Sequence, residues 1–247
     1  MVTIFACIIL LPYFTNSSTS TSSTPQTSNW AGYFVVSNLQ NPGPTIDAIN
    51  SSWIVPAVGS SVTDTYSAVW VGVGGGGQLD NDNSLIQTGT EQDFVGGQAY
   101  YSAWYEMLPN YSITIENMTI SPGDSIQVQI SLINPANNLW SISLADLTNG
   151  QSFHQDFNYS SKQLSAEWVV ERPEVNNQLS NLADFGSLNF TNCYATIANA
   201  TGSITNFPDS SMGMSDEIIG NVSVQLVNVS ALSNNGTQFN VTYTAGQ

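Results

Sequence analysis

The sequence predicts an all-β fold, an antiparallel β-sandwich. Short runs rich in Val, Ile, Thr, Tyr, Trp and Phe recur at close spacing, and Gly, Asn, Asp and Pro lie between them. Residues 125–133, S-I-Q-V-Q-I-S-L-I, alternate polar and apolar side chains with the period of a half-buried strand. No long stretch carries the apolar stripe of a helix. Antiparallel strands in two packed layers therefore fit the pattern better than parallel strands joined by helical crossovers.

The chain begins with two segments that we expect to lie outside the folded domain. Residues 1–14 are an apolar run without charge. This run is too short for a membrane-spanning helix, which needs about 20 residues. It resembles the apolar region of a secretory signal, although basic residues do not precede it. Residues 15–29 form a Ser/Thr-rich linker. We therefore expect export of the protein, no membrane association of its mature form, and a single domain over residues 30–247.

The predicted strands follow one another through this domain. They cover residues 30–37, 51–55, 67–73, 98–107, 125–133, 140–147, 166–171, 188–197, 222–229 and 239–244. One of them contains Glu167. Alternation places Ala166, Trp168 and Val170 on the opposite face of that strand, and we expect this apolar set to face the core. Glu167 then faces solvent or a cleft, and an ordinary exposed strand glutamate explains the spacing equally well.

Acidic residues far outnumber basic ones. The 247 residues include 18 Asp and Glu but only 2 Lys and Arg, for a formal net charge of −16. Because so few cations can neutralise phosphates, nucleic acid and anionic membrane surfaces are excluded as partners. A chain with few bases also gains little positive charge in acid. The composition therefore fits an acid-tolerant protein, and it fits a generic acidic secreted protein equally well.

The common catalytic groups are scarce. His154 is the only histidine and no G-x-S-x-G motif is present, so we expect a strand histidine at a surface rather than a Ser-His-Asp triad. Cys193 is the only cysteine beyond the apolar run, and its strand-like context indicates a small core residue. Asp80, Asp82 and Ser84 resemble the start of a calcium loop, but the glycine and glutamate that complete such a loop are missing. We expect no metal and no cofactor.

Asn-x-Ser/Thr sequons are frequent. They begin at Asn16, Asn50, Asn110, Asn117, Asn158, Asn189, Asn199, Asn221, Asn228, Asn235 and Asn240. In a host that glycosylates, they predict a secreted glycoprotein. Chance explains some of them, because the chain is rich in Asn, Ser and Thr.

Two short segments place polar residues in unusual settings. Pepsin-like enzymes present a catalytic aspartate where a strand ends in Asp-Thr-Gly, and residues 86–89, I-Q-T-G, have Gln87 in place of the acid. The motif could be a lost protease site, an ordinary turn, or a different means of activating water. Residues 100–108, Y-Y-S-A-W-Y-E-M-L, surround Glu106 with aromatic side chains.

Eight segments, taken in order, resemble the glutamic peptidases, or eqolisins, which are acid endopeptidases. They are S-N-W-A-G-Y-F-V (28–35), A-V-W-V-G-V-G-G (68–75), L-I-Q-T-G-T-E (85–91), G-G-Q-A-Y-Y-S-A-W-Y-E-M-L-P (96–109), I-S-P-G-D-S-I-Q-V-Q-I (120–130), L-T-N-G-Q-S-F (147–153), A-E-W-V-V-E-R-P (166–173) and A-D-F-G-S-L-N-F-T-N (183–192). The resemblance implies a sandwich of two large antiparallel sheets. It also implies a catalytic pair, Gln87 in a Q-T-G turn and Glu167. The substrate-binding positions that it implies are Trp30, Trp70, Tyr105 and Glu106.

The same resemblance implies a mechanism and a setting. Glu167 acts as general base on a water, and Gln87 holds that water and donates to the oxyanion of the tetrahedral intermediate. Metal, cofactor and covalent intermediate are not needed, the substrates are polypeptides, and the enzyme is a secreted monomer in an acidic environment. Gly74 and Glu91 depart from the family, which has an acidic residue and an Asp at these positions. The alternative is a non-catalytic sandwich, a carbohydrate-binding or cell-surface module, because a fold does not decide a function.

Overall fold

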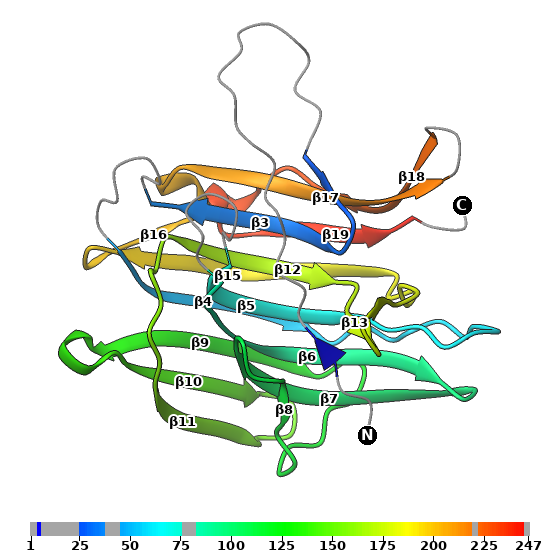
Figure 1. Cartoon of the computed structure of the whole chain (residues 1–247), viewed down its shortest axis with the longest axis horizontal. Helices are drawn as coiled ribbons and strands as arrows, with labels where there is room; N and C mark the ends of the chain where they lie inside the picture. Colours follow the sequence, from blue (N-terminus) through cyan, green and yellow to red (C-terminus); the bar gives the residue numbers. More distant parts are fainter. Residues whose placement is uncertain (1–3, 6–24, 38–44, 76–82, 219–221, 245–247) are drawn as a thin grey trace, which may run out of the picture.

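The computed structural model describes residues 4–5, 25–37, 45–75, 83–218 and 222–244, and these are almost entirely β-structure (Figure 1). Its strands are β1 (Ile4–Phe5), β2 (Gln26–Thr27), β3 (Trp30–Val36), β4 (Ile46–Ile54), β5 (Ala68–Gly74), β6 (Leu85–Val95), β7 (Gln98–Met107), β8 (Ile113–Thr114), β9 (Ser125–Asn134), β10 (Leu139–Asp146), β11 (Ser152–Asn158), β12 (Ser165–Glu171), β13 (Glu174–Val175), β14 (Gln178–Leu179), β15 (Ser187–Ile197), β16 (Ala200–Ser203), β17 (Asp209–Ile218), β18 (Val222–Val229) and β19 (Phe239–Tyr243). Within the described residues the only helical elements are three short 3-10 turns. No helix of this part of the chain could cross a membrane.

Sixteen of the strands form one continuous sheet that folds over on itself, and β1, β13 and β14 form a separate three-stranded sheet. We call one layer the front sheet, with strand order β17-β3-β12-β5-β6-β7-β8, and the other the back sheet, with order β11-β10-β9-β4-β15. Strands β18 and β19 join the layers along one side, because β15 pairs with β19 at one end and with β4 at the other. Except for the short parallel pair β2–β17, these pairings are antiparallel. The predicted antiparallel sandwich of two large sheets is confirmed.

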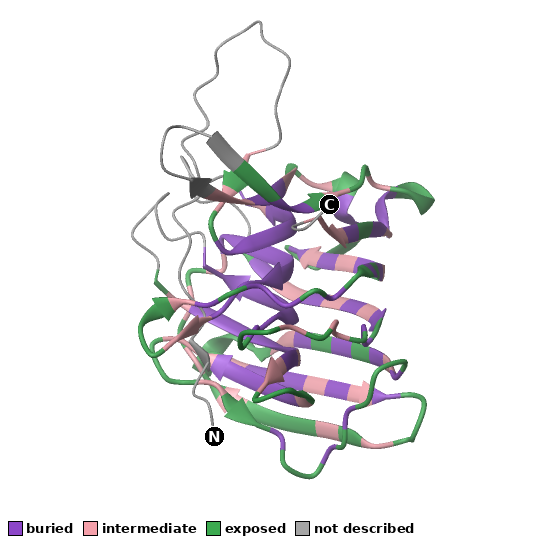
Figure 2. Cartoon of the chain, turned by 90° about the vertical axis from the view of Figure 1, so that its right-hand side faces the viewer, coloured by how far each residue is buried: buried purple, intermediate pink, exposed green. Residues whose placement is uncertain are grey.

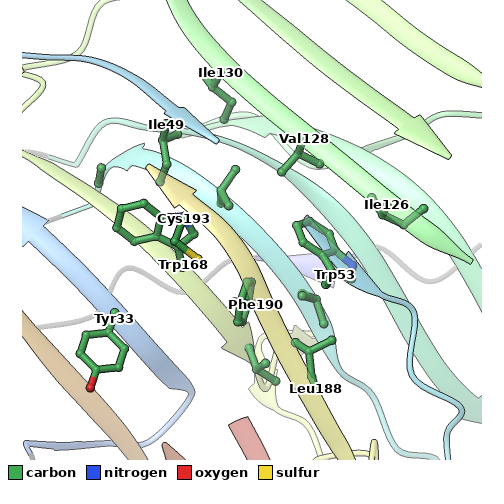
Figure 3. Close-up of a cluster of buried hydrophobic side chains, with 14 of the residues drawn as sticks. Tyr33, Ile49, Trp53, Ile126, Val128, Ile130, Trp168, Leu188, Phe190 and Cys193 are labelled. Carbon is green, nitrogen blue, oxygen red and sulfur yellow. The ribbon is translucent and has the colours of Figure 1, made fainter. Parts of the chain in front are cut away.

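The core lies between the two layers. Trp168 of the front sheet packs there with Trp53, Ile130 and Phe190 of the back sheet (Figure 3). The rings of Trp53 and Phe190 meet edge to face with centroids 5.8 Å apart. Burying each large apolar side chain contributes roughly 1.5–3 kcal/mol, so the aromatic residues in this layer stabilise the sandwich without a disulfide.

The two sheets differ in what their outer faces meet. In β5 and β12 of the front sheet every residue is buried, whereas β9 of the back sheet alternates buried and exposed residues. Figure 2 shows the difference as strands that are purple along most of their length in one layer and banded in the other. The front sheet is therefore covered on its outer face as well as on its core face.

Most predicted strands lie within a few residues of an observed one, but β6 and β17 were not predicted. The resemblance implied a turn at Q-T-G, and this segment is instead the middle of an 11-residue strand. An isolated glycine inside a strand marks a bulge or a close approach of another chain segment. Here a Cβ at Gly89 would lie 2.0 Å from the Val69 oxygen, so glycine serves close packing. The true turn is Gly96-Gly97, where both φ angles are positive and β6 pairs directly with β7.

Candidate active site

Adjacent strands of the front sheet carry the candidate catalytic residues in one row. Glu167 of β12 pairs with Gly72 of β5, Gly72 pairs with Gln87 of β6, and Gln87 pairs with Glu106 of β7. Residues paired across antiparallel strands project to the same side of the sheet, and the sequence neighbours of these residues belong to the core. Glu167, Gln87 and Glu106 therefore share the outer face of the front sheet.

Gly72 separates the two predicted catalytic residues. Strands lie about 4.8 Å apart, so the backbones at Glu167 and Gln87 are about 10 Å apart with only a glycine between them. A Cβ at Gly72 would lie 2.7 Å from Leu85 Cδ1 and 3.0 Å from Trp70 Cζ3. Glycine therefore lets these two apolar side chains lie directly on the backbone between the carboxylate and the amide.

A hydrogen bond fixes the amide of Gln87. Its Nε2 donates to Glu106 Oε2 at 2.6 Å. Its Oε1 is buried and accepts no hydrogen bond from the described residues. An amide nitrogen carries two hydrogens, so one remains for a second acceptor. In this position Gln87 offers both a donor and an acceptor to a third molecule, and neither function titrates.

The three polar residues of the row are almost completely buried. Gln87 is 0% exposed, and Glu106 and Glu167 are each 1% exposed. The prediction that the opposite face of β12, with Ala166, Trp168 and Val170, meets the core is confirmed. An ordinary exposed glutamate at position 167 is excluded, since the row lies in a covered, apolar environment.

Aromatic side chains border the row on the same face. Trp30 and Trp70 meet edge to face with ring centroids 4.9 Å apart. Trp70 Nε1 donates to Glu171 Oε2 at 2.7 Å, and Glu171 is also buried. The small apolar cluster around them consists of Trp30, Phe34, Ala68, Trp70, Leu85, Trp104, Val169 and Met212. The predicted site residues did not include Glu171, although alternation along the strand places it on the same face as Glu167.

Tyr105 is the one predicted site residue that the structure places elsewhere. It lies on the core face, where its ring stacks on Phe153 with centroids 5.3 Å apart and packs against Phe157. The reason is the period of a strand, since Tyr105 and its neighbour Glu106 must face opposite sides. Trp30, Trp70 and Glu106 share the face of Gln87 and Glu167, and Tyr105 does not.

Two further carboxyl groups lie on this face of β6. Burial raises the pKa of Asp93 to about 8, and the nearby charge of Glu91 adds to the effect, while the Ser67 amide partly opposes it. Burial also raises the pKa of Glu91, which accepts a hydrogen bond from Ser102 that works against the shift. Both groups therefore favour the protonated form in acid.

Gly74 shows what one departure from the family means structurally. Its φ is +101°, and a Cβ there would lie 2.3 Å from the Ser84 oxygen. This backbone cannot hold an acidic side chain at position 74 without moving. The site therefore lacks that carboxyl group by virtue of its backbone as well as its sequence.

The remaining chemical groups lie apart from the row. Cys193 is buried, and burial raises the pKa of its thiol to about 12, as expected of a core residue. The His154 side chain is 66% exposed at the outer face of the back sheet, also as expected. The calcium-like loop at Asp80 and Asp82 lies outside the described residues, as does the signal-like run except for β1. Within the residues that the structure describes, no cluster of three His, Cys, Asp or Glu side chains could hold a metal.

A buried carboxylate and a buried amide thus lie on one face of an antiparallel β-sandwich, and solved structures of glutamic peptidases share this fold. The Peptidase A4 family model matches residues 28–243, so the chain belongs to the peptidase A4 family. It is a glutamic endopeptidase, and its substrates are polypeptides.

Relatives and solved structures agree. The chain is 31% identical over 204 residues to aspergillopepsin-2 of Aspergillus niger, over 73% of this chain and 68% of that protein. It is 31% identical over 182 residues to scytalidopepsin B of Scytalidium lignicola, over 68% of this chain and 64% of that protein. A crystal structure of scytalido-glutamic peptidase with a transition state analog inhibitor matches with a TM-score of 0.70 and 27% identity, over 88% of this chain and 98% of that one. Aspergilloglutamic peptidase from Aspergillus niger matches with a TM-score of 0.58 and 32% identity, over 73% and 99% of the two chains.

Proposed function

We propose that this protein is a secreted acid endopeptidase in which Glu167 and Gln87 activate water directly. One observation carries the proposal: the two side chains share a buried face and only Gly72 separates their strands. A general base must come within hydrogen-bond reach of the water that it deprotonates. In this proposal both residues reach one shared water on that face.

In this mechanism Glu167 takes one proton from the water, while Gln87 Oε1 accepts a hydrogen bond from the hydrogen that stays on the oxygen. The hydroxide attacks the carbonyl carbon of the peptide bond, and charge develops on the carbonyl oxygen. The second N–H of Gln87, the one not bonded to Glu106, donates to that oxygen and stabilises it. Glu167 then gives its proton to the leaving amine.

Glu106 has a positioning role in this proposal. By accepting from Gln87 Nε2, it fixes which end of the amide faces Glu106 and which end stays available for water. The aromatic pair Trp30 and Trp70 supplies the apolar wall against which a substrate lies. Tyr105 has no part in it, because it lies in the core.

The acidic pH at which we expect the enzyme to act follows from the ionisation of Glu167 and from the small number of basic residues. Glu167 must be at least partly ionised to act as a base, and an ordinary glutamate has a pKa of about 4.3. Full protonation of the carboxyl groups leaves only 2 Lys and Arg and 1 His as charged side chains, so little repulsion builds up in acid. We infer an optimum around pH 2–4. The same proposal describes a monomer that acts through one domain, residues 30–247, without membrane association.

The test is digestion of an unfolded protein across an acid pH series, with mass analysis of the fragments. Glu167→Gln and Gln87→Ala should each remove most of the activity while circular dichroism shows an unchanged fold. Glu116→Gln and Gln98→Ala, at exposed positions, are matched controls and should retain it. Near-normal turnover in either site variant would exclude that residue from the mechanism. An optimum near neutral pH would contradict the acid function, and no cleavage at any pH would favour the binding-module alternative.

A further inference from the structure

The outer face of the back sheet has a hollow of about 540 Å³ over β4, β9, β10 and β11. Its side chains alternate along each strand with residues of the core, such as Val128 and Ile130. The hollow is therefore on the opposite side of the sandwich from Gln87 and Glu167. Its volume is within the range typical of small-molecule sites, about 300–1,000 Å³.

One row of side chains crosses the floor of the hollow. Asn50 of β4 pairs with Gln129 of β9, Gln129 pairs with Ser143 of β10, and Ser143 pairs with His154 of β11. The neighbouring row contributes Gln127 and Ser152. Amides, hydroxyls and one imidazole thus face the same space, and each of these groups can donate or accept hydrogen bonds.

Some of these polar groups are oriented by hydrogen bonds within the protein, and others make no hydrogen bond with described residues. His154 Nδ1 lies 2.9 Å from Ser143 Oγ, and His154 Nε2 lies 3.6 Å from Asp156 Oδ1. Asn50 Nδ2 donates to the Asn192 oxygen at 2.9 Å. The exposed amides of Gln127 and Gln129 have no hydrogen-bond partner among the residues that the structure describes. The hollow therefore presents oriented groups beside amides that can turn toward a ligand.

The lining identifies the chemistry of a ligand. It contains no Asp, Glu, Lys or Arg, and one of the two basic residues of the chain, Arg172, is buried in an ion pair with Asp216. The one lining group that can become cationic is His154, which is charged only if protonated and lies beside Asp156. A phosphate or carboxylate ligand would therefore find at most this single cation here. A purely apolar ligand would leave the amides without partners. A neutral molecule dense in hydroxyl groups satisfies both conditions.

We propose that this hollow binds a neutral oligosaccharide, independently of the peptidase site. The amides and hydroxyls of the row pair with sugar hydroxyls, and the imidazole of His154, fixed by Ser143, contributes one more oriented group. An enzyme with such a site can attach to a glycan that surrounds or decorates its protein substrate. The inference does not depend on the roles of Gln87 and Glu167.

The test is calorimetric titration with cellohexaose, maltohexaose and mannohexaose, with hexagalacturonate as the anionic comparison. The protein is made in a host without N-glycosylation, because Asn50 begins a sequon inside the hollow. At least one neutral hexasaccharide should bind with a Kd of about 1 mM or tighter. The double variant Gln129→Ala/His154→Ala should bind at least tenfold more weakly.

Two controls separate this site from the rest of the molecule. Gln155→Ala changes an exposed residue next to His154 that points to the other side of β11, and it should bind the sugar like the original protein. The peptidase activity of all these variants should be unchanged. No binding of any neutral hexasaccharide at about 5 mM, binding that the double variant leaves intact, or a preference for hexagalacturonate would each overturn the proposal.

Discussion

The front and back sheets are built from similar strands but differ in the burial of their outward-facing polar side chains. In the back sheet polar side chains alternate outward, and β9 exposes Gln127 and Gln129 while it buries Ile126, Val128 and Ile130. In the front sheet the outward positions are buried too, and they include Gln87, Glu106, Glu167 and Glu171 (Figure 2). A buried polar group costs free energy unless it has a partner. The front sheet, which carries the proposed catalytic groups, therefore buries polar side chains at a cost in free energy that the back sheet avoids.

The partners of these groups are largely within the same face. Glu106 accepts from Gln87, and Glu171 accepts from Trp70. Neither bond involves a basic residue, although buried carboxylates in most proteins are balanced by one. The donors in these two bonds are an amide and an indole, and neither group changes its charge in acid.

The largest expected effect in this comparison comes from the dyad of the front sheet. Each of Glu167→Gln and Gln87→Ala should lower kcat by about 100-fold or more, because loss of one oxyanion donor alone has effects of that size. The double variant should be hardly slower than the worse single variant, since residues that act as a unit are not additive. Steady-state kinetics of the three variants gives the answer, and multiplicative losses would show that the two residues act separately.

A methyl group added at Gly72 of β5, between the strands of Glu167 and Gln87, should have the next largest effect on activity. Gly72→Ala places a Cβ in the space of Leu85 and Trp70, so those side chains must shift toward Gln87 or Glu167. We expect kcat/KM to fall about 10- to 100-fold, because small misplacements of reacting groups are costly. Ser52→Thr adds a methyl group to the outer face of the back sheet and should leave kcat/KM unchanged. Full activity of the Gly72 variant would show that the spacing across β5 is not critical.

A smaller effect is expected at Glu171, which acts through Trp70. Glu171→Leu removes the acceptor of the Trp70 indole, and kcat/KM should fall about tenfold as the indole loses its orientation. Glu171→Gln keeps an acceptor oxygen and should restore most of this loss. Tryptophan fluorescence reports the environment of the indole, and it should change in the Leu variant only. Equal loss of activity in both variants would instead assign Glu171 a charge-dependent role.

The last effect concerns stability and is not expected to change activity. The folded state keeps a proton on Asp93 up to about pH 8, whereas the unfolded chain releases it near the ordinary pKa of 3.8. Stability from this group is therefore full in acid and is lost as pH rises from about 4 to 8, by at most about 1.4 kcal/mol per pH unit. Asp93→Asn should flatten that slope in guanidinium unfolding curves at pH 4, 6 and 8. Parallel slopes for the two proteins would exclude Asp93 as the cause.

This pH dependence is opposite to the usual expectation for carboxyl groups. The scarcity of bases predicts a chain that tolerates acid. In addition, the structure raises the pKa of Glu91, Asp93, Asp124 and Asp209, mainly through burial. Groups of this kind favour the fold at low pH. Burial therefore adds to acid stability, beyond the small number of positive charges.

Local patterns in the sequence predicted the sandwich and most of its strands. Period-two alternation is a local property, so the core face of β12 followed directly from Ala166, Trp168 and Val170. The same rule places Tyr105 and Glu106 on opposite faces of β7, so only one of them can belong to the site. The resemblance implied that both do, and Tyr105 lies in the core. Strand β6 was missed because the resemblance implied a turn at Q-T-G, whereas Gly89 packs against β5 inside the strand.

The register across strands could not be predicted from local patterns. Glu167 faces Gly72 only because β12 lies between β3 and β5, and that order joins segments far apart in the chain. Burial of Glu167 and Glu171 has the same origin. An outward-facing glutamate is normally exposed, and only tertiary structure covers this face.

The strand order of the front sheet also affects the order in which parts of the site form during folding. Strands β5, β6 and β7 are consecutive, so a newly made chain can pair Gln87 with Glu106 through a local hairpin, which forms quickly. Glu167 arrives later, because β12 must insert between β3 and β5 across a long stretch of sequence. We expect the catalytic pair to be completed only when the sheet is. A chain that is still unfolded, and therefore easily cleaved, does not yet have the means to cleave its neighbours.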